Sequence, residues 1–163
     1  MRCEHAAQGL LDSVPATDVS TQDAEIDALL DCQNWVVVGL RDDASRPAWR
    51  VAKFLVEHGK SLYPVHPHPE AVHGVPGYVS VAQACAAIVS EHGADALAST
   101  VVDCFVNSER VGAVADEAVA AGVCGVWMQL GVVDESAAQR VRAAGLVVVM
   151  DRCPAIEIPA RTN

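Results

Sequence analysis

Short apolar runs alternate with segments of helical periodicity along most of the chain, and this alternation constrains the fold more than any other feature. The runs are Trp35–Leu40, Leu62–Val65, Thr100–Val106, Gly125–Leu130 and Leu146–Met150. Continuous apolar runs of this length are typical of parallel strands that are buried on both faces. The sequence therefore predicts an α/β fold, a Rossmann-like doubly wound five-stranded parallel sheet with right-handed crossovers.

Four segments between these runs carry apolar residues three and four positions apart, as amphipathic helices do. They cover residues 48–56, 81–88, 111–118 and 137–144, and they are followed by Gly59, Gly93, Gly122 and Gly145. Glycine commonly ends a helix because it adopts the left-handed conformation without strain. A further helix is expected over residues 21–32, where Ser20 and Asp23 have a spacing similar to a capping box, and it is an addition to the core.

The chain has 163 residues, which suits one domain, and we predict a loose N-terminal arm over residues 1–20 and a single domain over 21–163. The net charge of −10 argues against general binding to nucleic acids or to anionic membranes, because both need a basic face. No apolar run approaches the roughly 18 residues that cross a bilayer. The six cysteines form no C-x-x-C motif, so a soluble, cytoplasmic protein with reduced thiols is expected.

The end of the first apolar run is a candidate anion site. Gly39 ends the strand, and the turn that follows leads to the start of the next helix, where free N–H groups and the helix dipole favour an anion. Arg41, Arg46 and Arg50 add positive charge. The alternative is that Ser45 only caps the helix and that the arginines are solvated.

Two absences argue against a dinucleotide enzyme. The chain has one glycine here instead of G-x-G-x-x-G, and the second run ends in Val65, His66 and Pro67 without the acidic residue that would bind a ribose. The segment from His66 to Gly77 is rich in histidine and proline and is expected to be a long loop at the ligand-binding edge. Its histidines are interpreted as polar loop residues in preference to metal ligands.

Cys153 follows the last run and is expected to emerge at the same edge, next to Arg152, whose charge could favour the thiolate. Such a thiol could be reactive, although no histidine lies near it in the sequence to act as a base. Cys104 and Cys124 lie in or beside apolar runs and are interpreted as small core residues.

Two strings, Trp127–Val133 and Met150–Pro154, resemble signatures of the small stand-alone CoA-binding domain proteins. The domain of that family is similar to the CoA-binding domain of the succinyl-CoA synthetase α subunit. The resemblance extends over roughly residues 34–158 and includes the order and spacing of the elements.

The resemblance implies a site for coenzyme A at the strand ends. By position, the implied cofactor-binding residues are Gly39, Leu40 and Arg41 at the diphosphate turn, Arg46 and Arg50 as cations, Val65, His66 and Pro67 beside the adenosine, Gln129, Leu130 and Gly131 under the ligand, and Asp151, Arg152 and Cys153 on the same wall. The family commonly has a small residue in place of Arg41, asparagine in place of His66, and arginines in place of Val106 and Asn107. These differences concern the phosphate contacts.

The sequence thus predicts a module that binds coenzyme A or an acyl-CoA without catalytic activity of its own and without a metal. One alternative is a CoA-linked thiol redox protein or enzyme that acts through Cys153, and another is a binder of NADP or another nucleotide. A homodimer or an unidentified protein partner is also possible under this prediction.

Overall fold

A computed structural model describes residues 21–162 of the chain, so the predicted N-terminal arm and Ser20 lie outside the described residues. Five parallel strands form one sheet in the order β2-β1-β3-β4-β5. The bounds are β1 Asn34–Val38, β2 Ser61–Val65, β3 Thr100–Cys104, β4 Gly125–Met128 and β5 Val147–Val149. This arrangement confirms the predicted Rossmann-like, doubly wound α/β fold.

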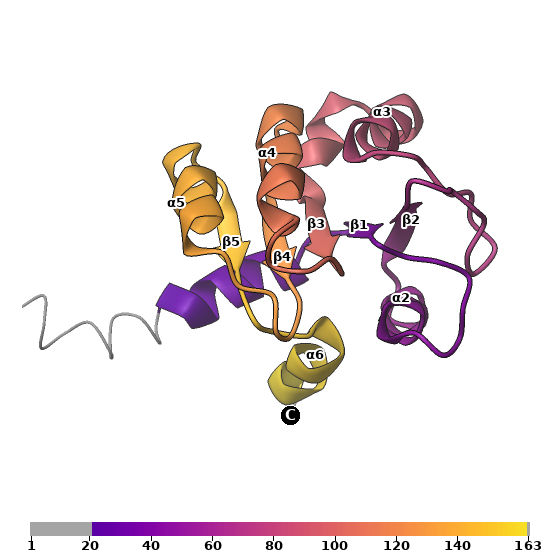
Figure 1. The fold of residues 1–163 in the computed structure, drawn as a ribbon, viewed down its shortest axis with the longest axis horizontal. Helices are drawn as coiled ribbons and strands as arrows, with labels where there is room; N and C mark the ends of the chain where they lie inside the picture. Colours follow the sequence, from indigo (N-terminus) through magenta and orange to yellow (C-terminus); the bar gives the residue numbers. More distant parts are fainter. Residues whose placement is uncertain (1–20, 163) are drawn as a thin grey trace, which may run out of the picture.

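Helices cover both faces of the sheet (Figure 1). Their bounds are α2 Pro47–Glu57, α3 Val81–His92, α4 Val111–Ala121, α5 Glu135–Ala143 and α6 Pro154–Thr162, and a further helix runs through residues 21–30. One hydrophobic core lies between the sheet and α3, α4 and α5. A second core lies between the other face and α2, α6 and the N-terminal helix, and it contains the tilted pair Trp35 and Trp127.

Several strands end earlier than their apolar runs. The clearest case is β1, which ends at Val38 because Gly39 has φ +90 and turns the chain out of the sheet. A Cβ atom on Gly39 would lie 2.4 Å from the carbonyl oxygen of Phe105, so this close approach of two strand ends requires glycine. In the same way, Phe105 and Val106 leave β3 and Gln129 and Leu130 leave β4, and all four become part of the loops at the carboxyl edge.

All four glycines predicted to end helices follow α2, α3, α4 and α5 with positive φ. Two elements were not predicted, namely the 3-10 helix η1 Ala94–Ser99 and the C-terminal helix α6. Arg161 of α6 binds Asp23 and Asp27 of the N-terminal helix through its guanidinium, at 3.1 and 2.6 Å. These ion pairs join the two ends of the described chain on one face of the sheet.

Within residues 21–162, no helix has both the length and the apolar character that crossing a membrane would require.

Candidate functional site

An open cleft of about 570 Å³ lies at the carboxyl ends of β1, β2 and β3. In this strand order the chain leaves β1 toward one side and β3 toward the other, which creates the crevice where doubly wound folds bind ligands. The cleft is lined by Val38, Gly39, Arg41, Arg46, Val65, His66, Pro67, His68, Val79, Ser80, Val81, Phe105, Val106, Asn107, Arg110, Val114 and Glu117.

Three helices begin at this cleft. Arg46 is the N-cap residue of α2 and Arg110 is the N-cap residue of α4, and neither side chain caps its own helix. Ser80, the N-cap residue of α3, accepts a hydrogen bond from the backbone N–H of Gln83. Ser45, the N-cap of α2 in the alternative interpretation, does not cap the helix, and its hydroxyl donates to Asp43.

Arginine at an N-cap is electrostatically unfavourable, because the amino end of a helix already carries partial positive charge. The side chain of Arg46 is 71% exposed and has only a long ion pair with Asp43, at 3.7 Å. No carboxylate of the described residues lies within ion-pair distance of Arg110. Two helix ends and two arginines therefore direct positive potential into one cleft of an acidic protein.

A carboxylate of the protein occupies the turn after β1. Oε1 of Glu70 accepts hydrogen bonds from Nε of Arg41 at 3.2 Å and from the backbone N–H of Asp42 at 2.6 Å. The Asp42 N–H and the Arg41 guanidinium hold the pKa of Glu70 below its usual value. A guanidinium together with a backbone N–H is also a donor set that can bind phosphate oxygens in proteins.

The loop from His66 to Gly77 is irregular, as predicted. Nδ1 of His66 accepts the backbone N–H of His68, and desolvation together with the charge of Arg41 lowers the pKa of His66. The neutral ring therefore carries its proton on Nε2. His73 lies apart from these two, against the ring of Trp49, and the described residues contain no group of three potential metal ligands.

The structure separates the residues implied by the resemblance into two groups. Six of them line the cleft, namely Gly39, Arg41, Arg46, Val65, His66 and Pro67. Leu40 has a buried side chain, and its N–H and that of Gly39 already donate to the carbonyl of Val65. The guanidinium of Arg50 points back to the carbonyls of Ala44 and Ser45, so Arg50 does not line the cleft.

The second group lies at the ends of β4 and β5, outside the cleft. The backbone N–H of Gly131 donates to Oδ1 of Asp151 at 2.8 Å, and Leu130 is 57% exposed. Arg152 donates to the side chain of Gln22 at 2.9 Å. Ser108, in the loop between β3 and α4, binds only the loop after β4: its hydroxyl oxygen accepts the N–H of Val133 and its hydroxyl donates to the carbonyl of Gly131.

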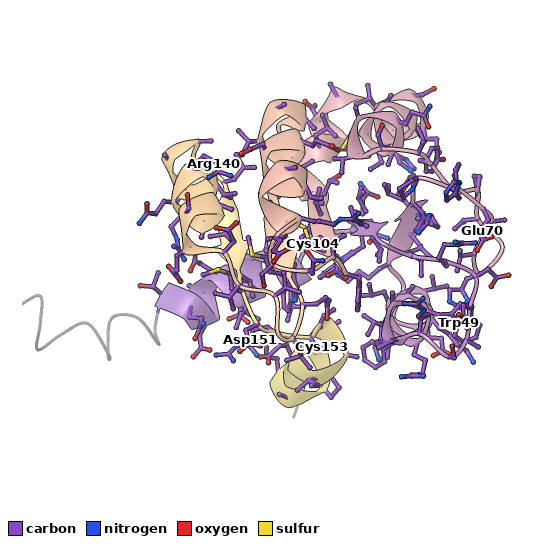
Figure 2. All side chains as sticks on the ribbon, in the orientation of Figure 1. Trp49, Glu70, Cys104, Arg140, Asp151 and Cys153 are labelled. Atoms are coloured by element: carbon purple, nitrogen blue, oxygen red, sulfur yellow. The ribbon has the colours of Figure 1, made fainter. Side chains whose placement is uncertain are left out.

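The expectation that Cys153 emerges at the ligand-binding edge is wrong. Cys153 is only 7% exposed and packs in the core beneath α6, beside Asp151 in Figure 2. Burial raises the pKa of its thiol despite the neighbouring helix N–H groups, and Arg152 is turned to Gln22. The tertiary packing of α6, an element that the sequence did not predict, covers this thiol.

Gln129 is also buried, and its Nε2 donates to Oδ1 of Asp103 at 2.6 Å. Asp103 lies in the middle of the sheet with no exposed surface, and its Oδ2 has no hydrogen-bond partner. Desolvation raises the pKa of Asp103 to about 7, although the bond from Gln129 opposes this effect. The side-chain amide of Gln129 therefore donates to the buried carboxyl group of Asp103.

Sequence reasoning missed several residues of the cleft, above all Arg110, Ser80 and His68. Arg110 directly precedes the predicted helix at 111–118, so its place at the start of a helix at the binding edge was the available signal. Ser80 precedes the apolar periodicity of the helix at 81–88 in the same way.

The fold and the cleft define a doubly wound α/β protein with a crevice lined by arginines at its carboxyl edge, and comparison with known proteins identifies its family. The model of a family described as "CoA binding domain" matches residues 33–159. The chain belongs to this CoA-binding domain family, in agreement with the predicted resemblance.

The chain is similar to one curated protein and to several solved structures. An uncharacterized protein of Bacillus subtilis (strain 168), YneT, is 30% identical over 117 residues, which cover 72% of this chain and 78% of that protein. A hypothetical protein from Pyrococcus horikoshii OT3 has a similar structure, with a TM-score of 0.72, 27% identity and coverage of 87% of this chain and 92% of that one. A protein from Thermus thermophilus has a TM-score of 0.69 at 25% identity, with coverage of 85% and 97%.

Proposed function

We propose that the cleft binds coenzyme A or an acyl-CoA through its phosphate groups, and that the protein performs no chemistry on it. The observation that carries this proposal is the convergence of two helix ends with arginine at the N-cap position, Arg46 and Arg110, on one crevice at the β1/β3 switch point. A ligand with several phosphates would compensate both charges. Membership of the CoA-binding domain family supports coenzyme A as that ligand.

The positions around the cleft suggest a division of roles. Arg46 and Arg41 lie near the diphosphate turn, and Arg110 supplies a cation on the β3 side, where Val106 and Asn107 have none. Val65, His66 and Pro67 would border the adenosine, with Nε2 of His66 as a donor. The pantetheine arm would run past Ser108 toward Leu130 and Gly131.

The absence of catalysis is part of the proposal. The thiol that sequence reasoning considered, Cys153, is buried and has a raised pKa, so it is a poor nucleophile toward a thioester. The biological effect of CoA binding would then depend on a partner protein, or a second copy of the chain, that binds the CoA-bound form.

The direct test is a thermal-shift and calorimetric titration with CoA, acetyl-CoA, dephospho-CoA and NADPH. A ligand that binds only the native state adds about 2.7 kcal/mol of stability at a hundredfold excess over its Kd. We expect stabilisation by CoA and acetyl-CoA, with acetyl-CoA recovered unchanged. Weaker stabilisation by dephospho-CoA than by CoA would show that the cleft binds the 3′-phosphate. Stabilisation by NADPH alone would contradict the proposal and favour a site for NADP or another nucleotide.

Glu70 provides a second prediction. Its carboxylate competes with ligand phosphate for Arg41 and the Asp42 N–H, so Glu70→Gln should lower the Kd for CoA severalfold. The neutral amide competes more weakly for a charged donor. Glu57→Gln, an exposed change on α2 that removes the same charge, is the matched control and should leave the Kd nearly unchanged. Equal or weaker binding by Glu70→Gln in calorimetry would show that Glu70 does not compete.

A further inference from the structure

Residues 129–132 form a tight turn directly after β4, at the carboxyl edge of the sheet, and we call it the β4 turn. The carbonyl of Gln129 accepts the N–H of Val132 at 2.9 Å, and Gly131, the third residue of the turn, has φ +79. A turn with positive φ at its third residue favours glycine there. The second residue is Leu130, which at 57% is more exposed than any other large hydrophobic side chain in the described part of the chain.

The hydroxyl group of Ser108 fastens one side of the β4 turn. Ser108 directly follows Asn107, which lines the cleft. Its hydroxyl oxygen accepts the N–H of Val133 at 3.0 Å, and its hydroxyl donates to the carbonyl of Gly131 at 3.4 Å. A single side chain therefore ties the β4 turn to the rim of the cleft.

The carboxyl group of Asp151 fastens the other side of the β4 turn. Its Oδ1 accepts the N–H of Gly131 at 2.8 Å. Asp151 is exposed and has φ +57, in the left-handed region that residues other than glycine seldom occupy, although aspartate tolerates it better than most. A strained backbone at an exposed residue beside a ligand-binding edge favours a functional role over a packing role.

The two fastenings have an energetic consequence for ligand binding. An exposed leucine gains nothing from burial in the free protein, but it gains free energy when an apolar group of a ligand covers it. A side chain that is held in place before binding also avoids the cost of being ordered by the ligand. The pantetheine arm of coenzyme A carries an apolar dimethyl group, and its proposed path leads past Ser108 to Leu130.

We propose that Ser108 and Asp151 are positioning residues, which hold the β4 turn so that Leu130 packs against the pantetheine arm of the ligand. This inference rests on the proposed binding of coenzyme A. It assigns Asp151 a role different from the direct contact with the cofactor that the resemblance implied. Because both residues act through Leu130, they should affect only ligands that carry the arm.

The test compares CoA with 3′-phosphoadenosine 5′-diphosphate, a shorter nucleotide that lacks the pantetheine arm. Calorimetry on the full chain should show tighter binding of CoA by the wild type. Asp151→Gly removes the hydrogen-bond acceptor but suits the positive φ, and Ser108→Ala removes the hydroxyl group. Each variant should raise the Kd for CoA about fivefold, which corresponds to ordering one side chain on binding, and leave the Kd for the shorter nucleotide unchanged.

Three further variants serve as controls. Asp151→Asn keeps an oxygen acceptor and tolerates the positive φ, so it should bind CoA as the wild type does. Ser136→Ala on α5 removes an exposed hydroxyl group that accepts a hydrogen bond from Arg140, and it is the matched control for Ser108→Ala. In a Leu130→Ala background, Asp151→Gly should weaken CoA binding little further, because the two changes remove the same contact.

The outcomes separate this inference from the proposed function. Equal weakening of both ligands in Asp151→Gly and Ser108→Ala would show a structural role and overturn the inference. Unchanged CoA binding in both variants would overturn it too, as would fully additive effects of Leu130→Ala and Asp151→Gly. If the wild type binds CoA and the shorter nucleotide equally well, this inference alone fails. If the wild type does not bind CoA at all, the proposed function fails with it.

Discussion

Replacing both arginines at the helix ends, in the double variant Arg46→Gln/Arg110→Gln, should weaken CoA binding about a hundredfold. Each substitution would remove a charge-assisted hydrogen bond to phosphate worth about 1.5 kcal/mol. This is the low end of the usual range, because both side chains are exposed. That free energy corresponds to about tenfold in Kd for each arginine. Calorimetry with CoA at fixed ionic strength gives the measurement.

The folding of this variant should not suffer. Neither arginine caps its helix, and removing a cation from a helix N-terminus relieves an unfavourable interaction with the dipole. The thermal unfolding midpoint without ligand should therefore be equal or slightly higher. Arg142→Gln, on α5 and away from the cleft, is the matched charge control. Undiminished affinity in the double variant would exclude the phosphate role of the cleft.

The second large effect is expected on stability, at the buried carboxyl group of Asp103. Its pKa is raised from 3.8 to about 7 by desolvation, so the folded state holds a proton that the unfolded chain has lost between these two values. Stability contributed by the protonated form is thus fully present below the unfolded pKa and is lost as the pH rises toward 7. Above that, the folded protein carries a buried carboxylate with one unpartnered oxygen.

Asp103→Asn should therefore stabilise the protein in neutral and alkaline solution. We expect a gain on the order of 3 kcal/mol above about pH 8, and almost none below about pH 3, where the wild-type carboxyl is neutral in both states. The asparagine oxygen still accepts the bond from Gln129. Urea unfolding at both ends of this range, under reducing conditions, measures the difference.

The control for this experiment is the exposed Asp95→Asn in η1. It removes the same charge without changing a buried group, so its effect on stability should be small at both pH values. A gain for Asp103→Asn that is equal at low and high pH would contradict the assignment, because it would point to packing instead of ionisation.

The prediction of the fold from the sequence succeeded where the signal was local. Five apolar runs, four amphipathic segments and the glycines behind them predicted the parallel sheet and its crossover helices. The predicted carboxyl ends of β3 and β4 were too late, and residues such as Phe105 and Gln129 lie outside the strands. The apolar run continues past the point where the chain leaves the sheet. The helix α6 was missed; it contains Pro159, a residue that usually ends or breaks a helix.

Six of the residues implied by the resemblance line the cleft, and their role in binding stays a prediction. Gly39, Arg41 and His66 lie there because they follow β1 and β2 closely, and the carboxyl ends of parallel strands share one edge. For Arg50 and Cys153, the direction of the side chain and the covering by α6 decided the outcome. Neither can be deduced from position along the chain.

The sequence by itself determined the class of fold, the edge at which a ligand would bind and the family resemblance, because periodicity, turn residues and short motifs are encoded locally. Only the tertiary structure decided which distant residues meet. It placed Arg110 and Arg46 at one cleft and the Glu70 carboxylate on Arg41. These contacts between distant residues depend on strand order, register and loop paths, which result from packing the whole chain around one sheet.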